Sequence, residues 1–136
     1  KKIYPSKLKI KVYEKKPIAI LQYKREKFYI NENIDLIEYF DLENYRYLPT
    51  IFGNKKNFKE LYENLKSINF PISSIKKYYL YNVNRWDIET YKNKIIKLPV
   101  KNYNESLKNF MTLKKEDYYD KYKVFDYRIT NQLILK

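Results

Sequence analysis

The sequence NRWDIETYKNKIIKLP at residues 84–99 places the only tryptophan of the chain at the head of an alternating stretch. Trp86, Ile88 and Thr90 share one face of an extended strand, because successive side chains of a strand point to opposite sides. Asn93 lies in the turn that follows and accepts a left-handed backbone more readily than most residues. The stretch predicts a β-hairpin, and we expect Trp86 to anchor the core rather than to form a ligand platform.

Alternation of apolar and polar residues predicts strands along most of the chain. The expected strands cover residues 7–14, 18–23, 27–32, 75–83, 85–91, 95–98, 123–129 and 132–136. Residues 32–50 are expected to be irregular, and no internal repeat is visible. Phe125, Tyr127 and Ile129 are expected to face inward, followed by a two-residue turn at 130–131.

Two helices are expected between the strands. The clearer one, residues 57–68, repeats apolar side chains at intervals of three and four, and Asn57 with Glu60 resembles a capping box. The second begins near residue 104, and the side chains that it is expected to bury are Leu107, Phe110 and Met111. These elements indicate an α+β fold, a mostly antiparallel sheet with two interposed helices.

The chain contains no cysteine and no histidine. This inventory excludes the common thiolate and imidazole zinc sites, disulfides and histidine-dependent catalytic triads. No stretch approaches the roughly 18 apolar residues of a membrane span, and the first residues lack the apolar core of a signal peptide. Because the chain begins within an expected strand, we expect it to be a piece of a longer protein.

The net charge of +13, from 29 cationic and 16 acidic residues, raises the possibility of nucleic-acid binding. Tyr78, Tyr79 and Tyr81, beside Lys76 and Lys77, would be the base-stacking residues, and a single-stranded nucleic-acid-binding domain is the alternative function. However, 25 of the cations are lysines and the chain has 14 asparagines, a bias that A- and T-rich codons alone produce. We therefore expect a solvated basic surface and a half-buried strand at these tyrosines.

An enzyme acting through carboxylates is a third class. The acidic residues on predicted surfaces are Glu14, Asp87, Glu89, Asp117, Asp120 and Asp126. No local spacing nominates a pair for acid/base work, and no glycine-rich phosphate loop is present. We predict no enzymatic activity, no cofactor, and no catalytic or metal-binding residue.

Five motifs together resemble the FtsQ/DivIB family of cell-division proteins, over residues 3–135. In chain order they are IYPSKLKIKVYEKKPIAIL (3–21), FYINENIDLI (28–37), YLPTIFG (47–53), NRWDIETYKNKIIKLP (84–99) and KVFDYRITNQLILK (123–136). The Arg-Trp-Asp form resembles the alphaproteobacterial version. The chain departs from the family where turns that often carry glycine have asparagine, at Asn33, Asn93 and Asn131.

The resemblance implies two domains, the last strand and junction of a truncated POTRA domain at residues 1–20 and an FtsQ-type β domain at residues 21–136. It implies a single-pass inner-membrane protein whose N-terminal helix is absent from this chain, with the present residues in the periplasm. It also implies a non-enzymatic divisome scaffold that binds FtsB- and FtsL-like proteins. One of these partners adds a strand to the edge formed by the last strand.

Residues 132–136 are the expected binding edge, because unpaired backbone groups of an edge strand are a template for another chain. The predicted partner-binding residues are Arg85, Tyr118, Tyr122, Arg128, Ile129, Asn131, Gln132, Leu133, Ile134 and Leu135. Tyr119 belongs to the same tyrosine-rich segment as Tyr118 and Tyr122. For Arg85 two interpretations stay open, an exposed cross-strand pair with Asp87 or contact with the partner.

Overall fold

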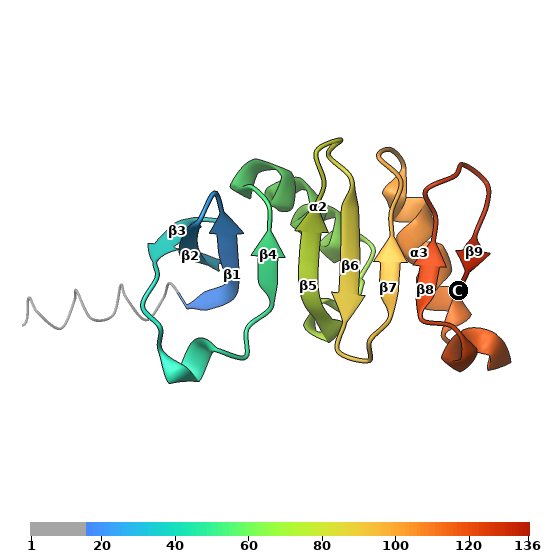
Figure 1. Cartoon of the computed structure of the whole chain (residues 1–136), viewed down its shortest axis with the longest axis horizontal. Coiled ribbons are helices and arrows are strands. Elements are labelled where there is room, and N and C mark those ends of the chain that lie inside the picture. Colours follow the sequence, from blue (N-terminus) through green and yellow to red (C-terminus); the bar gives the residue numbers. More distant parts are fainter. Residues whose placement is uncertain (1–15) are drawn as a thin grey trace, which may run out of the picture.

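The computed structural model describes residues 16–136. Their strands form one sheet, and both helices lie on the same face of it (Figure 1). The strands are β1 (Pro17–Tyr23), β2 (Glu26–Asn31), β3 (Leu36–Glu38), β4 (Thr50–Phe52), β5 (Ile75–Leu80), β6 (Trp86–Thr90), β7 (Ile95–Lys97), β8 (Val124–Asp126) and β9 (Ile134–Leu135). The helices are α2 (Lys55–Ser67) and α3 (Tyr103–Leu113), with short 3₁₀ helices η1 (Glu43–Tyr45), η2 (Ile72–Ser74) and η3 (Asp117–Lys121). The α+β class is confirmed.

The strand order is β3-β2-β1-β4-β5-β6-β7-β8-β9, so β3 and β9 are the two edges among the described residues. The pairs β1/β4, β4/β5 and β7/β8 are parallel and the others antiparallel. Helix α2 connects β4 to β5 and α3 connects β7 to β8, as parallel neighbours require. An antiparallel strand follows each of the two parallel pairs that a helix connects, so the architecture β-α-β-β occurs twice, at residues 50–90 and 95–135.

The core lies between the helices and the sheet. Trp86 is 3% exposed, and its ring meets Phe58 of α2 and Tyr78 of β5 edge-on at centroid distances of 6.4 and 6.3 Å. Around α3, Phe110 meets Phe125 of β8 edge-on at 5.0 Å. Trp86 is therefore a core anchor, as expected.

Several predicted elements differ from the structure. Residues 36–38, expected to be irregular, form β3 and pair with β2. Asn54, not Asn57, caps α2, because the Asn54 side chain accepts the backbone N–H of Asn57 at 2.8 Å. In α3, Leu113 is buried and Met111 only half-buried.

The terminal hairpin is much shorter than predicted. The Asp126 side chain accepts the backbone N–H of Arg128 at 3.0 Å, a local bond that competes with a strand ladder, and β8 ends there. Ile129 is 53% exposed and does not face inward. The turn itself forms, since the N–H of Gln132 donates to the Ile129 carbonyl at 3.1 Å, but residues 127–129 and 132–133 belong to neither strand.

The predicted strand 7–14 and Glu14 lie outside the described residues. The predicted domain boundary between residues 20 and 21 falls inside β1, which pairs with β2 and β4. The assignment of the residues before β1 to another domain stays a prediction.

Gly53, the only glycine of the chain, lies where β4 approaches β5 closely. A Cβ atom at this position would lie 2.8 Å from Leu80 Cβ and 3.2 Å from Trp86 Cη2. The left-handed backbone positions are held by other residues instead. They are Lys24, Arg25, Ile34, Asn69, Asn84, Asn93, Asn102 and Asn131.

We expect Gly53→Ala to lower the free energy of unfolding by about 1–3 kcal/mol, the usual cost of overpacking a core. The close contact involves Leu80 Cβ, an atom that rotamer changes of Leu80 do not move. Urea unfolding followed by the fluorescence of Trp86 measures the loss. Unchanged stability would show that β4 and β5 separate at little cost.

Candidate functional site

Strand β9 leaves one side of its backbone open. It pairs with β8 alone, in the register Phe125↔Leu135 and Asp126↔Ile134. Lys136 and Val124 exchange two hydrogen bonds, of 3.1 and 3.0 Å. Because such exchanging pairs alternate along an antiparallel ladder, the N–H and C=O groups of Leu135 and Leu133 point away from β8. The edge predicted at residues 132–136 is thus present among the described residues.

The side chains of this edge divide between the two faces of the sheet. Leu133 and Leu135 are half-buried and pack against the core, whereas Ile134 is 37% exposed. A chain lying along β9 would therefore meet two leucines on one face and one isoleucine on the other. Asn131 and Gln132 are exposed in the turn before the strand.

Residues 117–122, here called the tyrosine arm, lie beside the end of β9. Tyr118 and Tyr122 are half-buried, with ring centroids 6.5 Å apart. Tyr119 points inward and packs on Phe110 and Phe125 at 5.7 and 5.5 Å, and burial raises its pKa. The N–H of Lys123, next after the arm, donates to the Lys136 carbonyl at 2.8 Å. The structure thus brings the end of the tyrosine arm next to the last residue of the predicted edge.

Two arginines predicted to bind a partner are paired with aspartates two residues away in the chain. Arg85 Nη1 lies 2.6 Å from Asp87 Oδ1, and the side chains are only 13% and 7% exposed. The pair is neither exposed nor cross-strand, so that interpretation of Arg85 is wrong. Arg128 Nη2 lies 2.6 Å from Asp126 Oδ2, with the Arg128 side chain 44% exposed. Arg128 thus keeps an accessible face, whereas Arg85 is mostly enclosed.

The face of the sheet opposite the helices carries these charges in a row. Asp87, Lys97 and Asp126 are direct neighbours across β6, β7 and β8. Hydrogen bonds from the Arg128 guanidinium lower the pKa of Asp126 below its ordinary value. A carboxyl with a lowered pKa stays ionised and is a poor general acid.

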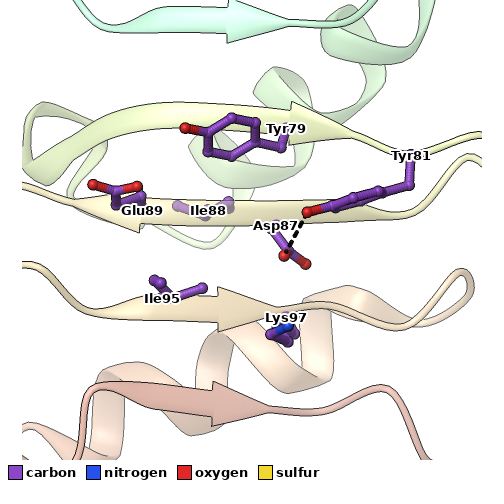
Figure 2. Close-up of a pocket in the computed structure, with 7 residues that line it drawn as sticks. All are labelled: Tyr79, Tyr81, Asp87, Ile88, Glu89, Ile95 and Lys97. Atoms are coloured by element: carbon purple, nitrogen blue, oxygen red, sulfur yellow. Dashed lines mark hydrogen bonds between the residues drawn. The ribbon is translucent and has the colours of Figure 1, made fainter.

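A pocket of about 210 Å³ lies on this face (Figure 2). It is lined by Tyr79, Tyr81, Asp87, Ile88, Glu89, Ile95 and Lys97. Figure 2 shows the Tyr81 hydroxyl donating to Asp87, at 3.3 Å, so this carboxylate is held by Tyr81 as well as by its arginine. The pocket is smaller than the roughly 300–1,000 Å³ of most ligand sites. Within residues 16–136, no group of three acidic residues is placed to hold a metal ion.

The strand proposed for base stacking offers few free rings. Tyr78 is 1% exposed, and the ring of Tyr79 is stacked on Phe52 with centroids 5.0 Å apart. Tyr79 is half-buried, and Tyr81, directly after β5, is 45% exposed. The structure adds no observation in favour of the nucleic-acid alternative.

Lys94 is a residue that the sequence did not single out. It lies directly after the turn of the β6/β7 hairpin, where a lysine is expected to be solvated, but it is 6% exposed. Its Nζ donates to the carbonyls of Tyr119 and Tyr122. No local sequence pattern predicts these contacts, because Tyr119 and Tyr122 lie 25 and 28 positions after Lys94 in the chain.

Comparison with known proteins identifies what the chain is similar to. A family model described as "Cell division protein FtsQ/DivIB, C-terminal" matches residues 19–128. The "Cell division protein FtsQ" of Rickettsia bellii (strain RML369-C) is 29% identical over 136 residues, 97% of this chain and 51% of the relative. The chain thus spans about half the length of this relative. Across residues 16–136 there is no helix with the length and apolar character of a bilayer span.

We expect Arg128→Gln to destabilise the protein at pH 7, because it leaves the buried Asp126 carboxylate without its cation. Since the folded-state pKa of Asp126 is lowered, the stabilisation is present above the unfolded value of about 3.9 and is lost as the pH falls through the folded value. The stability difference between wild type and variant should therefore shrink in acid. Urea titrations from pH 7 downward measure it.

The control is Arg46→Gln, which breaks a bidentate pair of the same chemistry with Asp41 in which both side chains are more than 60% exposed. Solvent screening makes such a pair contribute little. If both variants lose the same stability at pH 7, burial of Asp126 has no effect on its ion pair.

Proposed function

Because the chain belongs to the FtsQ/DivIB family of cell-division proteins, we propose that it is a non-enzymatic scaffold that captures another division protein at the open edge of β9. The observation that supports this function is the outward direction of the backbone groups of Leu133 and Leu135. The proposed partners are FtsB- and FtsL-like proteins. One of them contributes the added strand.

The edge backbone supplies only part of the binding energy. Each main-chain hydrogen bond contributes about 1 kcal/mol net, and two outward-facing residues offer four groups. Apolar contacts with the leucines and with Tyr118 and Tyr122 of the tyrosine arm supply the rest. Arg128 and Ile129, both exposed, border the other end of the edge.

The repeated β-α-β-β architecture indicates the direction of the guest strand. In the first unit, β6 is the closing strand, and its free side is covered by the antiparallel strand β7. In the second unit, β9 takes the place of β6. We therefore propose that the guest runs antiparallel to β9.

The resemblance also extends to the rest of the protein. We propose that residues 1–20 are the end of a POTRA domain and its junction, and that residues 21–136 are the β domain. A single helix N-terminal to these residues would anchor the protein in the inner membrane, with this part in the periplasm.

The decisive test uses Leu133, whose N–H points away from β8. Proline at this position removes the outward donor without removing a bond to β8. We expect Leu133→Pro to weaken binding of an FtsB-derived peptide at least about tenfold, one lost hydrogen bond plus the steric block of the ring. Fluorescence anisotropy with a labelled peptide measures the affinity.

Leu133→Ala is the matched control, because it keeps the backbone N–H and shortens the side chain. It should bind more tightly than the proline variant. Circular dichroism establishes that both are folded. Equal affinity of wild type and a folded Leu133→Pro variant would rule out pairing through β9.

A further inference from the structure

Lys94 carries a buried ammonium group in an unusual setting. Lysine is seldom fully buried, because an ammonium removed from water needs replacement partners. Here Nζ lies 2.8 Å from the Tyr119 carbonyl and 2.6 Å from the Tyr122 carbonyl. Both acceptors belong to the tyrosine arm, so one side chain holds the arm at two points.

Aromatic rings complete the environment of this ammonium. Nζ lies 4.6 Å from the ring centroid of Tyr119 and 5.9 Å from that of Phe125. A cation over a ring face is attracted by the ring quadrupole. No ion pair within residues 16–136 includes Lys94, so its charge is balanced by carbonyl dipoles and rings.

The backbone of Lys94 is fixed as firmly as its tip. Its N–H donates to Thr90 Oγ1 at 3.0 Å, and its carbonyl accepts the Thr90 N–H at 2.9 Å. The N–H of Ile95 donates to the Lys123 carbonyl at 2.7 Å, and Lys123 in turn donates to Lys136. Continuous hydrogen bonds thus join the hairpin turn, the end of the tyrosine arm and the last residue of the edge.

We propose that Lys94 is a positioning residue for partner binding, which holds the tyrosine arm against the sheet so that Tyr118 and Tyr122 form a wall beside the β9 edge. This inference rests on the proposed function of that edge. The ammonium is nearly enclosed and faces carbonyls and rings of its own chain, so it acts on the guest strand through the arm. Partner affinity then depends on a residue that the partner does not touch.

A double-mutant cycle separates this role from general support of the fold. Lys94→Met keeps the side-chain length and removes all donors, and we expect about tenfold weaker binding of the FtsB-derived peptide. In a Tyr118→Ala/Tyr122→Ala background the same substitution should cost less than about twofold, because coupled residues are not additive. Amide hydrogen exchange of residues 117–122 should also be faster in Lys94→Met.

Two further variants complete the design. Lys92→Met removes an exposed lysine on the same turn and should bind as wild type. Lys94→Gln keeps two N–H donors on a shorter side chain, should lose less affinity than Lys94→Met, and serves as the test variant if Lys94→Met does not fold.

Each remaining outcome overturns the proposal. Equal losses in both tyrosine backgrounds would show a structural role alone. If Lys94→Met binds the peptide as tightly as wild type while Leu133→Pro still binds it weakly, the role of Lys94 is refuted and pairing through the β9 edge is still supported. If the wild-type chain binds no peptide, the proposed function fails as well.

Discussion

Backbone amide and carbonyl groups need hydrogen-bond partners, and in an open sheet the edge strands cannot supply them from both sides. In this protein the outer side of β9 is such an edge, because the ladder with β8 engages Ile134 and Lys136 and leaves Leu133 and Leu135 turned outward. This outward direction separates the role of the leucine side chains from that of their backbone. The leucine side chains close the core, while their main chain remains available to another molecule.

The segment that flanks the opposite edge strand, β3, is held by different contacts. Tyr29 of the neighbouring strand β2 packs against Tyr39 and Tyr45, and its hydroxyl donates to the Phe40 carbonyl. The segment after β3 is thereby tied back to the sheet. At β9 the flanking segment is the tyrosine arm, whose Tyr119 and Tyr122 carbonyls accept hydrogen bonds from Lys94. Both edge strands are short, which is one way in which proteins discourage random edge-to-edge pairing.

Local patterns predicted much of this fold. Alternation identified the β6/β7 hairpin, and Asn93 takes the left-handed conformation expected of its turn, with φ of 64°. The edge itself was expected, since an apolar final strand and a family resemblance both pointed to residues 132–136. The wrong predictions, such as the overlong terminal hairpin, share a physical cause. Side-chain contacts compete with the strand ladder, and the alternation of apolar and polar residues does not reveal them. Asp126 captures a backbone N–H that a longer hairpin would use.

Lys94 illustrates the same limit more strongly. Its sequence context, a turn rich in lysine and asparagine, is typical of a solvated loop. Its burial depends on carbonyls supplied by a segment that folds against the sheet from elsewhere in the chain. An exposed pair across strands was expected for Arg85, but its ion pair with Asp87 is enclosed, which depends on neighbouring strands.

Eight non-glycine residues in the described part of the chain have positive φ, and they are candidate sites for engineering its stability. An L-residue in the left-handed region costs about 1–2 kcal/mol, less for asparagine. Ile34 is the extreme case, a β-branched residue at φ of 63° that is held by its 3% exposed side chain. At the exposed asparagine turns, glycine would relieve the folded state and loosen the unfolded one, and the balance differs from site to site. Glycine replacements at these turns therefore have to be judged one by one, and Asn131 differs from the others because it lies in the turn before β9, the proposed binding edge.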